Sequence, residues 1–122
     1  MQYLLLIYGN ESYWGKLSEA ERKAISDEYT EYTEYTNNIA QSGHLRGGNE
    51  LKAISTASTV RVRNKKRAIT DGPFAETKEQ LGGYYLVEAK DLDEALALAA
   101  RIPSARWGSI EVRPINPHPM PS

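Results

Sequence analysis

Apolar and polar residues alternate along several short segments of the chain, and this pattern predicts strands. Residues 3–8, Tyr-Leu-Leu-Leu-Ile-Tyr, are apolar at both alternating sets of positions, as in a strand that is covered on both faces. Residues 57–63 alternate cleanly, residues 67–70 return after a predicted turn, and residues 84–89 are rich in aromatic and β-branched side chains. Residues 109–115 are predicted to form a last strand near a sheet edge, because proline stands close to its end.

The longest amphipathic segment predicts a helix from Ser18 to about Gly43. Ser18 and Glu21 have the spacing of a capping box, and Gly43 suits the left-handed cap that ends many helices. Its tyrosines are interpreted either as core residues whose phenol groups reach polar partners or as the wall of a ligand site. The predicted inner face consists of Leu17, Ala24, Ile25, Tyr32, Tyr35 and Ile39, with Tyr29 at its margin.

A second helix is predicted over residues 92–102. Asp91 and Glu94 have the spacing of an N-terminal cap, and Pro103 disfavours a helical conformation in the residue before it. The residues that this helix is expected to bury are Leu92, Ala95, Leu96 and Ala99. Residues 44–55 are expected to be irregular, with a turn at Gly47-Gly48 and a short strand near residues 51–54 as an option.

The resulting order, β-α-β-β-(loop)-β-α-β, predicts an α+β fold. It matches the ferredoxin-like βαββαβ arrangement, with both helices on one face of an antiparallel sheet, once one accessory strand is left aside. Residues 3–8 are apolar on both faces, so the second sheet face also needs cover, and we expect a homodimer joined sheet to sheet. The domain is expected to span residues 1–115, followed by a Pro-rich C-terminal tail at residues 116–122.

The composition is that of an ordinary globular domain and narrows the choice of partners. The net charge of −1 supplies no basic field for phosphates, so nucleic acid is not expected as a partner. Cysteine is absent, which excludes disulfides and thiolate metal sites. The apolar segment 3–8 lacks the features of a signal peptide and is too short to span a membrane, so we expect a cytoplasmic protein with no membrane partner.

A long motif at residues 70–85, Thr-Asp-Gly-Pro-Phe-Ala-Glu-Thr-Lys-Glu-Gln-Leu-Gly-Gly-Tyr-Tyr, suggests a family. Together with residues 3–9, 59–63, 103–106 and 108–114, it makes nearly the whole chain resemble YCII-related proteins of the DGPF subgroup. The resemblance implies a dimeric α+β barrel of ferredoxin-like subunits. Some members are linked to extracytoplasmic-function sigma factors, so a non-catalytic module that associates with a sigma factor is the alternative to a small-molecule enzyme or binder.

The wider YCII-like group is suspected of activity built on a histidine and an aspartate that face a pocket. The aspartate of that pair matches Asp71 here. The histidine does not carry over, because the helix predicted from Ser18 to Gly43 contains none and the two histidines of the chain are His44 and His118. The resemblance therefore leaves Asp71 without its partner.

Asp71 is the candidate catalytic residue, as a general base or as an anchor for a ligand donor. Work as a base near neutral pH requires a raised pKa, and the same aspartate can instead accept backbone N–H groups at the turn formed by residues 72–73. Tyr8, Glu28 and Glu50 are the candidate ligand-binding residues. Glu28, on the inner side of the long helix, is either paired with a tyrosine or an arginine or is functional.

No metal or cofactor is expected. Glu76 and Glu79 stand three apart, but they are more simply a solvated turn beside Lys78. Gly82-Gly83 precedes a strand rather than a helix, so it is predicted to form a bulge or a tight strand start and not a nucleotide loop.

Overall fold

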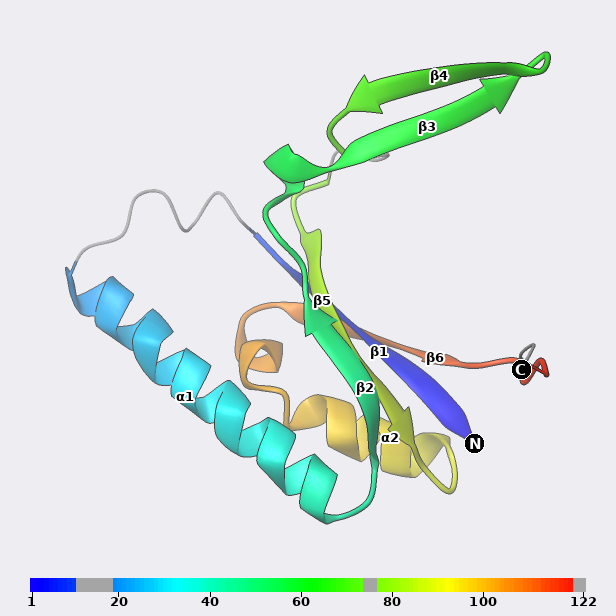
Figure 1. The fold of residues 1–122 in the computed structure, drawn as a ribbon. Coiled ribbons are helices and arrows are strands. Elements are labelled where there is room, and N and C mark those ends of the chain that lie inside the picture. The colour runs from blue at the N-terminus through cyan, green and yellow to red at the C-terminus, as the bar shows by residue number, and fades with distance from the viewer. Residues whose placement is uncertain (11–18, 74–76, 120–122) are drawn as a thin grey trace.

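Two helices pack against a four-stranded antiparallel sheet in the computed structural model, which describes residues 1–10, 19–73 and 77–119 (Figure 1). The sheet strands are β1 (Gln2–Gly9), β2 (Leu45–Glu50), β5 (Gln80–Glu88) and β6 (Ser109–Pro114). Their order across the sheet is β2-β5-β1-β6, and β1 and β5 are the central strands. With one helix after β1 and another after β5, this is the ferredoxin-like arrangement, and the predicted α+β fold is confirmed.

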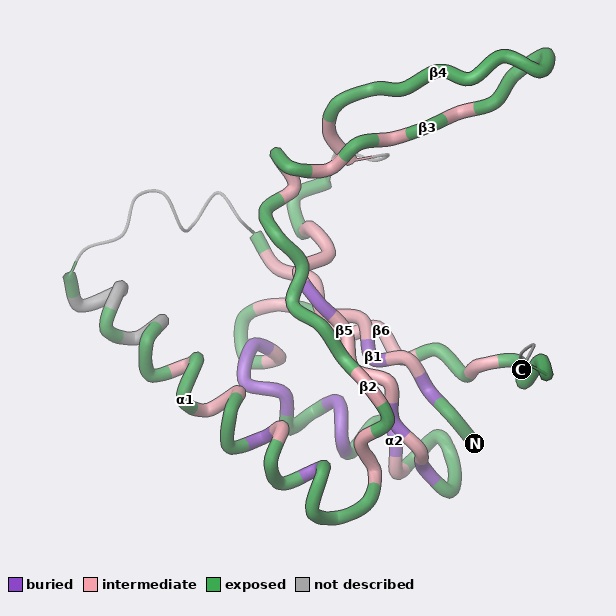
Figure 2. The backbone as a smooth tube through the Cα atoms, viewed as in Figure 1, coloured by how far each residue is buried: buried purple, intermediate pink, exposed green. Residues whose placement is uncertain are grey.

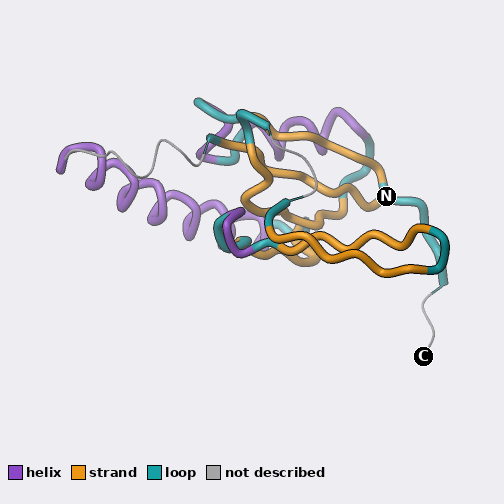
Figure 3. Tube along the Cα trace, turned by 90° about the horizontal axis from the view of Figure 1, so that it is seen from above, coloured by secondary structure: helices purple, strands orange, loops and turns teal. Residues whose placement is uncertain are grey.

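Helix α1 (Glu19–Gln41) ends where the sequence predicts. Gly43 follows it with a φ of +84°, in the left-handed region that a residue without a Cβ adopts at little cost. The predicted cap at Ser18 and the predicted inner residue Leu17 lie outside the described residues, as do the side chains of Ala24 and Ile25. The N-terminal end of α1 extends away from the sheet in both views (Figures 1 and 3).

Helix α2 (Leu92–Ala100) begins at the predicted cap, where the Asp91 carboxylate accepts the Glu94 backbone N–H at 2.9 Å. It ends two residues before the predicted position, and a 3-10 turn, η3 (Pro103–Arg106), follows. The prediction of its buried face was wrong in part. Ala95, Leu98 and Ala99 are buried, whereas Leu92 and Leu96 are 48% and 47% exposed.

The core lies between the two helices and one face of the sheet (Figure 2). Tyr3 and Leu5 of β1 and Val87 of β5 point into it, because alternate residues of a strand share a face and Tyr3 is paired with Val87. The largest fully buried side chains are Leu5, Ile39, Ile102 and Val87. Burial of each such side chain contributes roughly 1.5–3 kcal/mol.

The segment predicted to be irregular contains strand β2, and this prediction was wrong. Residues 45–50 pair with β5 through a bulge near Leu45, and residues 54–56 form a 3-10 turn, η2 (Ile54–Thr56), instead of the optional strand. Gly47 and Gly48 therefore lie inside a strand and not in a turn. The predicted bulge at Gly82-Gly83 is confirmed, because the register of β1 and β5 shifts there and leaves Gly82 as the extra residue.

Strands β3 (Ser58–Arg63) and β4 (Lys66–Asp71) form a separate two-stranded hairpin, which we call the arm. Asn64 and Lys65 connect the strands with φ values of 52° and 63°, as in the two-residue turns that match the twist of a hairpin. The arm projects away from the helices and the sheet (Figures 1 and 2). The same side of the arm carries Val60, Val62 and Ile69, and each of them is 58–60% exposed.

The sheet face opposite the helices, which we call the open face, is also apolar at its centre. Leu4 and Leu6 of β1 lie between the inward-facing residues, and they are paired with Leu86 and Tyr84 of β5. All four side chains are intermediate in exposure.

Candidate functional site

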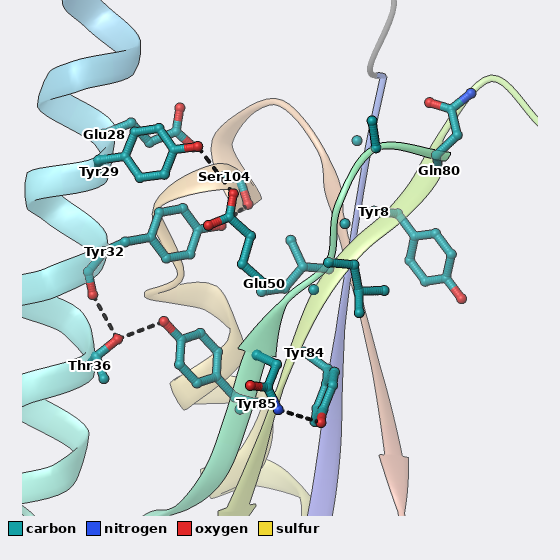
Figure 4. Close-up of a pocket in the computed structure, with 18 of the residues that line it drawn as sticks. Tyr8, Glu28, Tyr29, Tyr32, Thr36, Glu50, Gln80, Tyr84, Tyr85 and Ser104 are labelled. Carbon is teal, nitrogen blue, oxygen red and sulfur yellow. Dashed lines mark hydrogen bonds between the residues drawn. The ribbon is translucent and has the colours of Figure 1, made fainter. Parts of the chain in front are cut away.

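A cavity of about 530 Å³ lies between helix α1 and the sheet (Figure 4). We call it the α1–sheet cavity. Its volume lies within the range of pockets that hold small organic ligands. The described residues that line it come from β1, α1, β2, β5 and the η3 turn. Its aromatic and acidic lining residues are Tyr8, Tyr29, Tyr32, Tyr84, Tyr85, Trp107, Glu28 and Glu50.

The α1 wall of the cavity is a hydrogen-bonded row of hydroxyl groups. Tyr32 and Thr36 project from α1 toward the sheet, and Tyr85 projects from β5 toward α1 (Figure 4). The hydroxyls of Thr36 and Tyr85 lie 2.7 Å apart, and the hydroxyl of Tyr32 hydrogen-bonds to that of Ser104 in η3. Burial raises the pKa of Tyr32 to about 12, so its phenol stays neutral.

The three tyrosines of α1 divide between the two interpretations that the sequence allows. Tyr35 is a core residue: it is buried, its hydroxyl donates to the Leu98 carbonyl at 2.8 Å, and its ring meets that of Tyr85 edge to face at 5.3 Å. Tyr29 and Tyr32 line the cavity instead. One helix thus contributes both to the core and to the cavity wall.

The sheet side of the cavity includes glycines from two neighbouring strands. Gly48 of β2 and Gly83 of β5 both line it. A Cβ at Gly48 would lie 2.9 Å from the Tyr84 carbonyl oxygen, and a Cβ at Gly83 would lie 3.0 Å from the Asn49 carbonyl oxygen. The two strands therefore approach more closely here than strands with side chains could.

Glu28 lies on the cavity wall and is one of the predicted ligand-binding residues. Burial raises the pKa of its carboxyl, while the hydrogen bond from the Trp107 side chain and the nearby Arg106 guanidinium lower it by less. Trp107 packs against the backbone of β1, because a Cβ on Gly9 would lie 2.9 Å from its ring. Glu28 is thus hydrogen-bonded by an indole, which the sequence did not predict, it feels Arg106 only through its charge, and its carboxyl group lines the cavity.

Glu50, the last residue of β2, also lines the cavity. Its carboxylate accepts a hydrogen bond from the Tyr29 hydroxyl at 3.1 Å, which joins the end of the strand to α1 (Figure 4). Burial and this carboxylate together raise the pKa of Tyr29, so the phenol remains a donor. The structure thus brings Glu28 and Glu50 to the same cavity, from a helix and from a strand.

Tyr8 lines the cavity but turns its ring away from α1 (Figure 4). Its hydroxyl donates to the Glu111 carboxylate of β6 at 3.4 Å. Of the three predicted ligand-binding residues, Tyr8 is therefore the one whose polar group is directed elsewhere.

Asp71 does not line the α1–sheet cavity in this subunit. It is exposed, at the end of β4, and pairs with Ser58 across the arm. Gly72 follows with a φ of +98°, and its N–H donates to the Ala57 carbonyl at 2.7 Å, which closes the base of the arm. Gly72 thus supplies the permissive turn conformation, while both roles considered for the Asp71 carboxylate, at the turn and in catalysis, stay predictions.

His44 does not replace the missing histidine at the cavity. Its Nε2 lies 3.0 Å from the Glu94 carboxylate and its Nδ1 lies 2.6 Å from the Ser42 hydroxyl, so it ties the end of α1 to the start of α2. The residues that the sequence interpretation did not place in a site are chiefly Ser104 and Trp107. Ser104 belongs to the family-like stretch at residues 103–106, which is the one signal that could have drawn attention to it.

Two classes of feature are not found in the described part of the chain. No group of three or more histidine, aspartate or glutamate side chains is placed to hold a metal ion within residues 1–10, 19–73 and 77–119. Among the helices described, none is long and apolar enough to cross a membrane.

Comparison with known sequences identifies the family of this chain. A family model described as the YCII-related domain matches residues 1–119. The chain belongs to the YCII-related family. A relative from Rhizobium meliloti (strain 1021), an uncharacterized protein, is 36% identical over 127 residues, and the alignment covers all of both chains. The family therefore agrees with the sequence resemblance and with the ferredoxin-like fold.

Proposed function

We propose that this YCII-related protein binds a small organic molecule in the α1–sheet cavity. The observation that carries the proposal is a cavity of about 530 Å³ that combines aromatic walls with a few placed polar groups. Small-molecule sites have this composition, because the apolar walls provide affinity and the polar groups fix orientation. Glu28 and Glu50 are the ligand-orienting residues, and Tyr8 borders the site.

A substitution that fills the cavity tests this proposal. Ala53 lines the cavity and is exposed, so Ala53→Trp is expected to obstruct it without disturbing the core. Ala97→Trp, on the exposed side of α2, adds the same ring away from the cavity and is the matched control. A library of metabolites is screened by ligand-observed NMR. Hits should be lost in Ala53→Trp and kept in Ala97→Trp, and hits that survive both substitutions would argue for a different site.

An enzymatic role for Asp71 forms a second part of the proposal. Asp71 lies on the arm and does not line the cavity of its own subunit. It can therefore reach a bound ligand only if the arm approaches the cavity of another subunit, and a second copy of the chain is the simplest candidate. Asp71→Asn is expected to leave folding intact and to weaken turnover or binding of any ligand found. Equal binding and equal turnover in both proteins would remove Asp71 from the site.

A homodimer is the proposed assembly. Among the described residues, the apolar side of the arm is exposed and the centre of the open face is partly exposed, and contiguous exposed apolar surface normally marks an interface. Charge supports a second copy as the partner. Five basic residues and Asp71 give residues 58–71 a net charge of +4, which leaves −5 for the rest of a chain whose total is −1. The arm of one subunit is therefore complementary to the body of another.

Sedimentation equilibrium tests the dimer, with two substitutions on opposite sides of the arm. Val60→Asp places a charge on its apolar side and is expected to shift the mass toward the monomer. Thr70→Asp introduces the same charge on the other side of the arm and is expected to stay dimeric. A wild-type monomer mass at all concentrations would refute the assembly. The sigma-factor alternative gains no specific support from the described residues and stays a prediction.

A further inference from the structure

The charged lining of the α1–sheet cavity has a single sign. Among its described lining residues, two are acidic, Glu28 and Glu50, and none is Lys, Arg or His. The two carboxylates come from different elements, α1 and β2, and the Glu50 carboxylate reaches across to the Tyr29 hydroxyl of α1 at 3.1 Å, so a ligand at this end of the cavity meets both. A carboxylate or phosphate ligand would meet repulsion from these two carboxylates, and the described lining offers it no cationic side chain.

The aromatic lining favours a positive charge for a separate reason. The face of a tyrosine or tryptophan ring carries partial negative charge and attracts an ammonium group within about 6 Å of its centre. Tyr29 and Tyr32 from α1 and Tyr85 from β5 present rings to the cavity (Figure 4), and Trp107 borders it. These rings also offer apolar surface, which suits a ligand with a hydrophobic body attached to the charge.

Arg106, in η3, is hydrogen-bonded to groups that do not line this cavity. The Arg106 guanidinium donates to the Glu31 carboxylate at 2.6 Å and to the Pro103 carbonyl at 2.9 Å. Arg106 and Glu31 both line a second, smaller cavity and not this one. Arg106 does lower the pKa of the Glu28 carboxyl, but it does not occupy the space in front of it.

We propose that the α1–sheet cavity selects a small organic cation: an amine or quaternary ammonium group joined to an apolar or aromatic body. The ammonium group lies beside Glu28 and Glu50 against the tyrosine rings, and the apolar body lies on the aromatic surface of the cavity. This inference rests on the proposed small-molecule function and narrows its ligand class.

Three probes that share a benzene ring and differ in charge test the proposal. They are 2-phenylethylamine, which is a cation at neutral pH, 2-phenylethanol, which is neutral, and 3-phenylpropionate, which is an anion. Their affinities for the full chain are measured by NMR titration at pH 7.5 in low salt, because salt screens charge interactions. We expect the cation to bind at least about tenfold more tightly than the alcohol, and the anion to bind more weakly than either.

Substitutions of the two cavity glutamates test whether these residues cause the preference for a cation. Glu28→Gln and Glu50→Gln keep the side-chain shape and remove one charge each, so each should reduce the affinity for the amine severalfold and leave that for the alcohol unchanged. Glu34→Gln, on the exposed side of the same helix, removes an equal charge outside the cavity and is the control. It should leave both affinities unchanged.

The outcomes separate this inference from the function on which it rests. Equal affinities for amine and alcohol, or tighter binding of the anion, would overturn the cation preference and leave a ligand cavity in place. No binding of any probe up to high millimolar concentration would count against the cavity as a ligand site altogether. An amine preference that survives both glutamate substitutions, or is lost equally in Glu34→Gln, would show that the site lies elsewhere.

Discussion

The adjacent glycines of β2 provide a matched test of the strand assignment. A Cβ at Gly48 would lie 2.9 Å from the Tyr84 carbonyl oxygen and 3.0 Å from Tyr85 Cδ1, whereas ordinary contacts begin near 3.4 Å. A Cβ at Gly47 would meet only the Leu86 Cβ, at 3.8 Å. Gly48→Ala must therefore push β2 away from β5 by several tenths of an ångström, whereas Gly47→Ala fits without movement.

Overpacking of this kind costs about 1–3 kcal/mol. Gly47→Ala should change stability by less than about 1 kcal/mol, in the stabilising direction, because alanine restricts the unfolded chain more than glycine does. Urea unfolding followed by circular dichroism measures both. With a slope of about 1.5 kcal/mol per molar urea, Gly48→Ala should lower the midpoint by about 0.7–2 M. If residues 47–48 formed a turn, the two substitutions would not separate in this way, and equal midpoints would refute the assignment of β2.

Three further predictions concern the core and the cavity. Ile39→Ala should lower the free energy of unfolding by about 2–5 kcal/mol in urea titrations, while Leu92→Ala, at an exposed site, should change it by less than about 0.5 kcal/mol. Tyr35→Phe removes the hydrogen bond to the Leu98 carbonyl and should cost about 1 kcal/mol by thermal unfolding, and no change would show that water replaces the hydroxyl. The raised pKa of Glu28 means that the folded state binds its proton more tightly than the unfolded state, so ionised Glu28 lowers stability above that pKa. Glu28→Gln should therefore raise the melting temperature at pH 7 by no more than about 4 °C and leave it unchanged near pH 4, and a fall at pH 7 would reverse the sign of the argument.

The same carboxyl group predicts how the binding of an organic cation depends on pH. Tyr32 and Trp107, with the charges of Arg106 and Glu31, surround Glu28, and burial raises its pKa. The affinity for 2-phenylethylamine should therefore fall as pH decreases through a value above the usual range of a glutamate, and Glu28→Gln should remove this step. An NMR titration between pH 4 and pH 8 checks the position of the midpoint.

Local chemistry determined the parts of the fold that the sequence predicted well. The cap at Asp91, the left-handed Gly43 and the hairpin turn at Asn64-Lys65 depend on neighbours in the chain, so a pattern of a few residues suffices. Strand β2 was missed because a pair of glycines has no strand propensity of its own. Those residues become a strand because β5 offers them backbone partners, and that partner is more than thirty residues away.

The candidate site was also predictable only in part: single residues could be selected from the sequence, but their arrangement could not. Glu28 and Glu50 could be selected from the sequence, because a carboxylate on the inner side of a helix or at the end of a turn needs a partner. The two glutamates line one cavity because α1 packs against β2, and this packing cannot be predicted from a local sequence pattern. Asp71 was placed at the cavity because its motif is long and specific, but the direction of the arm is set by tertiary structure.

The position of β1 in the sheet has a consequence for how the domain is made. Residues 2–9 pair on one side with β5 at residues 80–88 and on the other with β6 at residues 109–114. Both partners of the earliest strand therefore belong to the later part of the domain. During synthesis, the apolar strand β1 therefore has no neighbour until residues 80–88 have been translated and only one until residues 109–114 follow, and such long-range pairing is slow to form. The order of synthesis thus exposes the most apolar strand of the sheet for longest.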